Sequence, residues 1–193
     1  DDYNFLIKHS TASIKEKLTE INYQKDYILD IGSRDAEFFQ FLQQQAKELS
    51  LVDIAANNLD LTAKAQKFIL DEDLSSLPKN KFNLITSILY LHYINDLPGF
   101  MSQIKNCLNE KGLFVASFFG GDTLKDFKES CLKADMENAQ AVARITPFVE
   151  IKTMGMILQK LGFFMPVVDS EMVEVTYDEP MKLIRDLHHM GES

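Results

Sequence analysis

The stretch YILDIGSRDAEFFQFLQ, residues 27–43, joins a short apolar run to an amphipathic segment through a turn at Gly32. An unbroken apolar run such as residues 27–31 is typical of a strand that is covered on both faces of a sheet. From Ala36 onward, apolar side chains recur at helical spacing. A strand, a tight glycine turn and a helix form the usual cofactor site of α/β folds, so the stretch predicts an α/β fold with a ligand at Gly32.

The alternation of strands and helices continues along the chain. Strands are predicted at 51–55, 67–70, 82–91 and 113–119, and helices at 7–21, 36–49, 57–66 and 96–111. The first helix belongs to an N-terminal helical segment, residues 1–25, and Asn95 is the expected N-cap of the helix at 96–111. This alternation predicts a parallel sheet that is wound in both directions, with ligands at the carboxyl ends of its strands.

The pattern changes after the fifth strand. Residues 120–149 are predicted to form a helical insertion that acts as a lid over the cofactor cleft, with Asp122 as a helix N-cap. A further amphipathic helix follows at 148–161, and Gly162 is its expected stop.

The remaining residues predict a hairpin and a helix. Residues 163–177 indicate two strands with a turn near Asp169–Ser170, placed as an antiparallel hairpin at the sheet edge. A last helix is expected to begin at Pro180. All of these elements, with helices on both faces of the sheet, fit a single domain of residues 1–193.

Composition limits the classes of partner and location. A net charge of -9 repels phosphate backbones, which weighs against a nucleic-acid partner. No run approaches the roughly 18 apolar residues that span a bilayer, and no signal peptide is evident, so a cytoplasmic location without an integral membrane segment is predicted. Adjacent His188 and His189 face different directions on a helix, so no metal site is expected. The start without Met predicts a portion of a longer protein.

Acidic side chains follow the expected strands where a nucleoside would lie. Asp53 comes about 20 residues after the glycine turn, at a position where a carboxylate accepts hydrogen bonds from both ribose hydroxyls. Asp71 and Asp73 follow the third strand, and either one lies beside an adenine amino group or in a solvated loop. Arg34 stands where a G-x-G-x-x-G motif has its second glycine, which weighs against a nicotinamide cofactor.

Several segments together resemble the class I S-adenosylmethionine-dependent methyltransferases. They are LDIGSRDAEF, VDIAANNL, DLSSLP and FNLITSILYLHYINDLPGFMSQIKNCLNEKGLFVASFFGGDTL. Within this class the chain resembles two groups: the biotin-pathway enzymes that methylate a malonyl carrier protein, and the mitochondrial complex I assembly factors with a methyltransferase fold, together with their bacterial relatives. LHYINDLP, FFGGDTL, RITPF and HMGES point to the assembly-factor group.

The resemblance implies a Rossmann-like sheet of seven strands, whose last two strands form the hairpin, and S-adenosylmethionine as cofactor. It further implies that the turn wraps the methionine part of the cofactor, and that Asp73 rather than Asp71 is the acid beside the adenine. The strand end from Ser87 to Leu89 matches the one that passes beneath the sulfonium. The implied cofactor-binding residues are Asp30, Gly32, Ser33, Asp53, Ile54, Asp73, Leu74, Ser87 and Leu89.

His92 and Tyr93 are the candidate catalytic residues, because they follow the fourth strand, where an acceptor atom would meet the methyl group. Methyl transfer needs mainly alignment, and a base only if the acceptor must lose a proton. His92 is the candidate base and Tyr93 the candidate orienting hydroxyl. The alternative is that His92 caps the following helix or packs in a hydrogen-bond network.

The glycine turn departs from the family pattern Gly-x-Gly-x-Gly, because the chain has Gly32, Arg34 and Ala36 there. A side chain forced into a left-handed conformation costs roughly 1–2 kcal/mol, so two lost glycines are expected to weaken cofactor binding about a hundredfold unless the turn takes another path. Arg34 also places a cation near the sulfonium unless it swings away or pairs with Asp35 or Glu37.

Two functions follow from this resemblance. The first is methyl transfer from S-adenosylmethionine to a small acid, a carrier-bound group or a protein. The alternative is a methyltransferase-fold protein that hydroxylates an arginine of a respiratory-complex subunit, or that acts in complex I assembly without catalysis.

Overall fold

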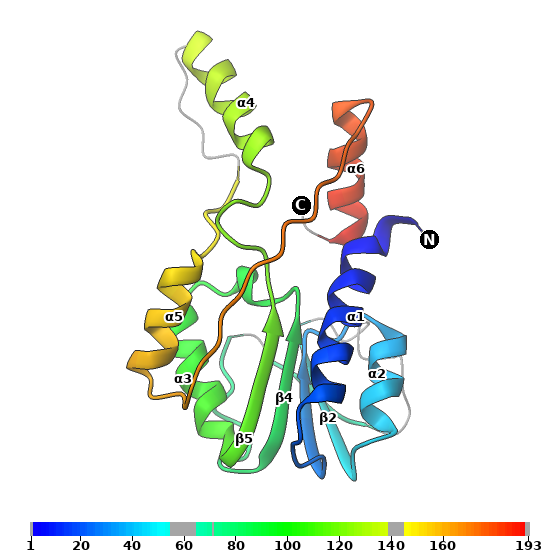
Figure 1. The fold of residues 1–193 in the computed structure, drawn as a ribbon. Helices are drawn as coiled ribbons and strands as arrows, with labels where there is room; N and C mark the ends of the chain where they lie inside the picture. Colours follow the sequence, from blue (N-terminus) through cyan, green and yellow to red (C-terminus); the bar gives the residue numbers. More distant parts are fainter. Residues whose placement is uncertain (1, 55–64, 71, 139–144, 192–193) are drawn as a thin grey trace. The chain divides into compact units, whose positions relative to one another are not determined.

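The computed structural model describes residues 2–54, 65–70, 72–138 and 145–191 (Figure 1). These residues fall into two compact units. The first unit comprises residues 1–118 and 171–193, and the second comprises residues 119–170.

A parallel sheet with the strand order β3-β2-β1-β4-β5 forms the centre of the first unit. Its strands are β1 (Tyr27–Ile31), β2 (Glu48–Asp53), β3 (Gln66–Ile69), β4 (Phe82–Ile88) and β5 (Leu108–Ser117). Every residue of β4 is buried, as its β-branched and aromatic composition predicts for a central strand. Chain order reverses between β1 and β4, so the carboxyl ends of these two strands flank the switch point at which α/β sheets bind ligands.

The described part of the first unit contains four α-helices. They are α1 (Phe5–Glu20), α2 (Ala36–Gln43), α3 (Leu97–Cys107) and α6 (Pro180–Met190). The helix α2 connects β1 to β2 and α3 connects β4 to β5, and these two steps run in opposite directions along the sheet. Because such crossovers are right-handed, α2 and α3 lie on opposite faces of the sheet. Within the described ranges, no helix has the length and apolar character that a bilayer crossing requires.

The helix α2 is shorter than the predicted segment 36–49, although Ala46 and Leu49 continue its apolar spacing. It ends at Gln43, because residues from Glu48 onward pair with β1 as strand β2. Strand pairing with a buried neighbour therefore outweighs the helical pattern. The short helix expected at 57–66 falls almost entirely outside the described residues.

The N-cap of α3 is Asp96 rather than the predicted Asn95. The carboxylate of Asp96 accepts a hydrogen bond of 3.0 Å from the backbone N–H of Gly99, whereas the side chain of Asn95 donates to Glu72.

We expect Asp96→Ala to lower the free energy of unfolding by about 1 kcal/mol, as the loss of a capping carboxylate does. Urea unfolding measures this change. Asp122→Ala is the control, because the predicted cap Asp122 lies before Leu124, the N-cap of α4, which makes no side-chain cap bond. A similar loss in both variants would contradict the assignment.

The predicted hairpin is absent from residues 163–177, which form no strand in the structure. Its two arms fall in different units, with the division after Ser170. Met165 has a left-handed φ of 47°, and Pro166 has no N–H to donate to a ladder, so both interrupt the first arm. The expectation of seven strands with an antiparallel edge is therefore not confirmed: the described residues form a five-stranded parallel sheet.

The second unit contains α4 (Lys125–Glu137) and α5 (Ile151–Lys160). Before α5, the rings of Phe119 and Phe148 lie 5.9 Å apart, and the Nζ of Lys128 lies 4.7 Å from the centroid of the Phe148 ring. Gly162 ends the second helix with a φ of 73°, which confirms the predicted stop. The insertion 120–149 lies within this unit, and its action as a lid stays a prediction.

Candidate functional site

The turn after β1 is built around Gly32. Its φ of 74° lies in the left-handed region, and its N–H donates a 2.8 Å hydrogen bond to the carbonyl of Val52 in β2. A Cβ atom at this position would lie 2.6 Å from Cγ and 2.7 Å from Cβ of Tyr90, which is itself buried. Both the backbone conformation and the contact with Tyr90 therefore require a glycine here.

The rest of the turn does not need the two missing glycines. Among the described non-glycine residues, Arg34 and Ala36 are not in the group with positive φ. The carboxylate of Asp35 accepts a 2.9 Å hydrogen bond from the N–H of Glu37, so α2 begins at once, at Ala36. The turn thus takes another path than Gly-x-Gly-x-Gly, and the expected strain from two lost glycines is not present.

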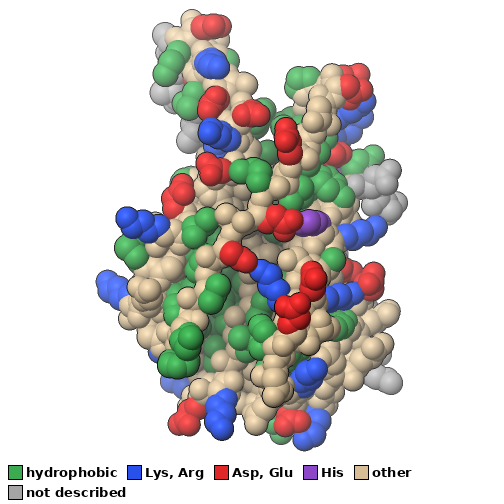
Figure 2. All heavy atoms as spheres, viewed as in Figure 1, with side chains coloured by type: hydrophobic (Ala, Val, Ile, Leu, Met, Phe, Trp, Pro, Cys, Tyr) green, Lys and Arg blue, Asp and Glu red, His purple; other side chains and the backbone are tan. Residues whose placement is uncertain are grey.

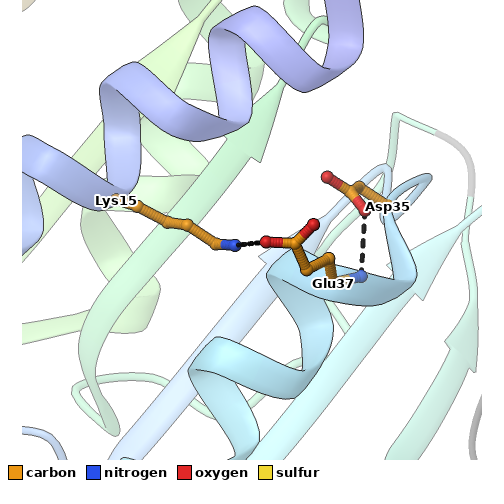
Figure 3. Close-up of polar contacts among 3 residues, drawn as sticks. All are labelled: Lys15, Asp35 and Glu37. Atoms are coloured by element: carbon orange, nitrogen blue, oxygen red, sulfur yellow. Dashed lines mark hydrogen bonds and ion pairs between the residues drawn. The ribbon is translucent and has the colours of Figure 1, made fainter.

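Arg34 points toward the C-terminal end of α6. Its Nη1 donates a 3.4 Å hydrogen bond to the carbonyl of Met190, and its guanidinium carbon lies 5.1 Å from the centroid of the Tyr93 ring. The acids that the sequence offered as partners make other contacts: Asp35 caps α2, and Glu37 accepts a 2.7 Å bond from the Nζ of Lys15 (Figure 3). The guanidinium therefore contacts the end of α6 and an aromatic ring.

Asp30 is buried in β1, with a side chain held by a hydroxyl group. The Oγ1 of Thr86 donates a 2.7 Å hydrogen bond to its Oδ1. Burial raises the pKa of the Asp30 carboxyl to about 6, and the charges of Asp53 and Asp35 act in the same direction, while hydrogen bonds from Thr86 and Ser33 oppose the rise. A cationic ligand group would favour the ionised form of this carboxyl.

A small cavity lies at the turn and brings three of the predicted cofactor residues together. Asp30, Gly32 and Ser33 line it beside Arg34, and Ile7, Asp35, Phe38 and Ile88 complete its wall. Its volume of about 10 Å³ is close to the room that one water molecule needs. Asp30 and Arg34 therefore line the same small cavity.

The other predicted acids lie at the neighbouring strand ends. Asp53 is buried as the last residue of β2 and directly follows Val52, whose carbonyl accepts the hydrogen bond from Gly32. Ile54, in contrast, is exposed. Asp73 is exposed, and its carboxylate accepts a 2.8 Å hydrogen bond from the N–H of Ser75 in its own turn. Asp71 lies outside the described residues. Of Asp53 and Asp73, Asp53 is thus the acid that directly follows a residue bonded to the turn.

Three more of the predicted cofactor-binding residues, Leu74, Ser87 and Leu89, are buried. The left-handed φ of 47° at Leu89 directs the chain into a 3-10 helix at Leu91–Tyr93, which carries both candidate catalytic residues. The rings of His92 and Tyr93 lie 4.3 Å apart. The N-cap of α3 is Asp96, so His92 is not its cap.

A family model described as a methyltransferase domain matches residues 6–165. The chain belongs to this methyltransferase-domain family. The match confirms the resemblance to methyltransferases that the sequence indicated.

Relatives and solved structures agree with membership in the methyltransferase-domain family. Arginine-hydroxylase NDUFAF5, mitochondrial, from Dictyostelium discoideum is 31% identical over 99% of this chain and 49% of that protein. Malonyl-[acyl-carrier protein] O-methyltransferase 1 from Coxiella burnetii is 27% identical over 99% of this chain and 66% of that protein. An S-adenosylmethionine dependent methyltransferase from Mesorhizobium loti shares the fold, with a TM-score of 0.62, 18% identity, and coverage of 82% of this chain and 83% of that one. The chain thus spans about half to two thirds of the length of these curated relatives.

Two features of this methyltransferase-domain site had no signal in the sequence. Tyr90 packs on Gly32, although its place at the end of an apolar run indicates only a strand residue. The hydroxyl of Tyr93 donates a 2.7 Å hydrogen bond to the carbonyl of Gly191, so a second residue of the site contacts the end of α6. Both contacts join residues far apart in the chain, where no spacing rule applies.

Proposed function

We propose that the chain is a S-adenosylmethionine-dependent methyltransferase whose acceptor is a small acid, a carrier-bound group or a protein. The observation that carries this proposal is the hydrogen bond between the N–H of Gly32 and the carbonyl of Val52, which places the glycine turn directly beside Asp53. The glycine turn suits the methionine part of the cofactor, and Asp53 suits its ribose. Relatives named as methyltransferases support the assignment.

The chemistry of the donor groups fits S-adenosylmethionine. A carboxylate at the end of β2 has two oxygens for the ribose hydroxyls, and Asp30 at the turn suits a ligand ammonium. The enclosed cavity at the turn holds about one water, so a ligand enters only when the residues that line it move apart. Ile7 from α1 and Phe38 from α2 are the wall residues whose helices would have to shift.

When bound, S-adenosylmethionine supplies a methyl group on a positively charged sulfur. The chain itself aligns the acceptor, and we assign this task to the 3-10 helix after β4. We assign to His92 the removal of a proton from an acceptor that must lose one, and to Tyr93 the orientation of the acceptor through its hydroxyl. The Tyr93 hydroxyl would first leave the carbonyl of Gly191.

A second candidate function is arginine hydroxylation of a protein, with a respiratory-complex subunit as partner. Relatives named arginine-hydroxylase NDUFAF5 from Dictyostelium discoideum and Danio rerio favour it, since each is aligned over 99% of this chain. A non-catalytic role in assembly of the same complex belongs to this alternative. Micromolar binding of S-adenosylmethionine would favour methyl transfer, and millimolar or absent binding would favour the alternative.

The charge of the chain weighs against a nucleic acid as the acceptor. The net charge is -9, and Lys and Arg side chains lie scattered among acidic ones on the face drawn in Figure 2. The proposed acceptor is therefore a small acid, a carrier-bound group or a protein. A cytoplasmic location stays a prediction, and the name of the Dictyostelium discoideum relative gives that protein as mitochondrial.

We expect Asp53→Ala to weaken binding of S-adenosylmethionine by about 1.5–3 kcal/mol, which is roughly a ten- to hundredfold loss of affinity, because a charged acceptor for the ribose hydroxyls is removed. Isothermal titration calorimetry of the folded protein measures it. Asp26→Ala is the matched control: it also removes one negative charge, but Asp26 precedes β1 at the opposite end of the sheet, where it pairs with Lys47. Equal affinities of Asp53→Ala and wild type would remove Asp53 from the site.

A further inference from the structure

The residues that follow β3 connect the end of β2 with the residues that precede α3. The N–H of Leu70 donates a 3.1 Å hydrogen bond to the carbonyl of Asp53, the last residue of β2. Two positions later in the chain, the carboxylate of Glu72 accepts hydrogen bonds from Asn95 and Asp96, which lie between the 3-10 helix and α3. A short piece of backbone therefore joins the strand end that carries the proposed ribose acid to the segment that follows the 3-10 helix.

Both oxygens of the Glu72 carboxylate take part in this contact. Its Oε1 accepts from the backbone N–H of Asn95 at 2.9 Å and from the side-chain amide of Asn95 at 2.6 Å, and its Oε2 accepts from the N–H of Asp96 at 3.3 Å. The bond from the Asn95 backbone, together with the other two, lowers the pKa of Glu72, so the carboxylate is ionised at neutral pH. The bonds are therefore charge-assisted, and they fix two successive N–H groups of the backbone.

A side chain of α3 holds the backbone of Glu72. The Oε1 of Gln103 accepts a 2.7 Å hydrogen bond from the N–H of the buried Leu74, and its Nε2 donates a 3.0 Å bond to the carbonyl of Glu72. Glu72 is thus bonded to α3 through its backbone and to the residues before α3 through its side chain. The carboxylate therefore extends from a backbone that is itself held in place.

The segment that Glu72 holds adjoins a very short helix. In the 3-10 helix, the N–H of Tyr93 donates a 3.0 Å bond to the carbonyl of Tyr90, and the N–H of Ile94 donates a 3.3 Å bond to the carbonyl of Leu91. A single turn of this kind has little stability of its own, so its arrangement depends on the residues that hold its ends. The residues bonded to Glu72 come directly after Ile94, so Glu72 holds one of these ends.

We propose that Glu72 is a positioning residue, which couples a nucleoside bound at Asp53 to the arrangement of the 3-10 helix that carries the candidate catalytic residues. The proposal rests on the proposed function, in which Asp53 binds the ribose of the cofactor. A ligand that fixes the end of β2 also fixes Leu70 and Glu72, and Glu72 then holds the segment after the 3-10 helix in one place. The bound cofactor would thus order the residues that align the acceptor before the acceptor arrives.

Adenosine separates this coupling from contacts with the rest of the cofactor, because it has the base and the ribose but no sulfur and no amino acid. In wild type, saturating adenosine should slow hydrogen exchange of the Tyr93 and Ile94 amides at least about fivefold. Glu72→Met removes the acceptor oxygens and nearly keeps the length of the side chain. In this variant the slowing should fall below about twofold, while calorimetry still detects bound adenosine.

Two further variants isolate the acceptor oxygen. Glu72→Gln is also neutral and similar in size to Glu72→Met, but its oxygen can accept both bonds from Asn95, so it should restore most of the slowing. Glu48→Met is the matched control, since it removes another half-buried carboxylate, one that pairs with Lys81 at the other end of the sheet and should leave the slowing unchanged. Asn95 and Asp96 are exposed, so water can replace the carboxylate in Glu72→Met, and urea unfolding verifies that the fold is retained.

The outcomes separate this proposal from the proposed function. If Glu72→Met keeps the slowing of wild type, or if Glu72→Gln or Glu48→Met loses it as well, the contact with Asn95 does not carry the coupling and the proposal is overturned. It is also overturned if Glu72→Met no longer binds adenosine, because Glu72 is then part of the nucleoside site itself. A wild type that binds S-adenosylhomocysteine but shows no slowing with adenosine overturns it too, although the cofactor assignment stands. If wild type binds neither ligand, the proposed function and this proposal both fail.

Discussion

Replacing Gly32 by Ala is expected to lower the free energy of unfolding by about 2–5 kcal/mol, the largest effect of any single change considered for this chain. Its φ of 74° is unfavourable for a residue with a side chain, and the added Cβ would meet the buried ring of Tyr90. The conformation alone costs roughly 1–2 kcal/mol, and overpacking a core adds about 1–3 kcal/mol. Urea unfolding followed by circular dichroism measures the change.

A second glycine gives a matched control for this substitution. Gly155 lies inside α5, and a Cβ built there meets no described atom within 4 Å. Gly155→Ala should therefore stabilise its helix by roughly 0.5–1 kcal/mol, since glycine is unfavourable in a helix interior. A Gly32→Ala protein as stable as wild type would show that the turn and Tyr90 relax without loss, and that the glycine is not required for the fold.

Replacing Asp30 by Asn is expected to stabilise the chain at neutral pH. Burial raises the pKa of Asp30 to about 6 in the folded chain, above its ordinary value of 3.8. The folded state therefore binds this proton more tightly than the unfolded state. The contribution of Asp30 to the free energy of unfolding is highest below pH 4, falls as the pH rises from about 4 to about 6, and is then lower by about 3 kcal/mol. The neutral Asn side chain removes this loss, so the stability of the variant relative to wild type should increase across that window.

Unfolding at pH 4.5 and pH 7.5 tests the effect of Asp30→Asn. The hydroxyl of Thr86 can donate to the Asn oxygen as it does to Asp30, so the hydrogen bond is retained. Asp73→Asn is the control. Hydrogen bonds from Ser75 lower the pKa of Asp73 below its ordinary value of 3.8, so its contribution is present at both pH values and is lost only in more acidic solution, and the stability of this variant relative to wild type should be nearly the same at pH 4.5 and pH 7.5. A constant difference between Asp30→Asn and wild type at both pH values would show that Asp30 titrates alike in the folded and unfolded chain.

Local sequence signals predicted those parts of the fold that depend on neighbouring residues. The apolar run of β1, the glycine turn, the start of α2 and the start of α6 at Pro180 all lie where the pattern places them. Each depends on a few adjacent residues: a glycine with φ of 74°, the capping carboxylate of Asp35, or a proline in the first helical turn. Acids at strand ends were also predictable, because parallel strands bring their carboxyl ends to one edge.

The parts that the sequence did not predict depend on contacts between distant residues. Leu49 continues a helical pattern, but pairing with β1 makes it a strand residue. The alternation in 163–177 indicates strands, but a strand forms only when a neighbouring strand pairs with it. The path of Arg34 depends on a carbonyl 156 residues away in the chain. Patterns within a short stretch of sequence do not indicate such distant partners.

The contact between Arg34 and Met190 has a consequence for the order of events during synthesis. The five strands of the sheet lie within residues 27–117, so this sheet can assemble before residues 180–191 have left the ribosome. Until α6 has been made, the donors of Arg34 and Tyr93 lack the carbonyls of Met190 and Gly191 as acceptors. A nascent chain of this protein would therefore pass through a stage in which the sheet is complete and these two contacts are still missing.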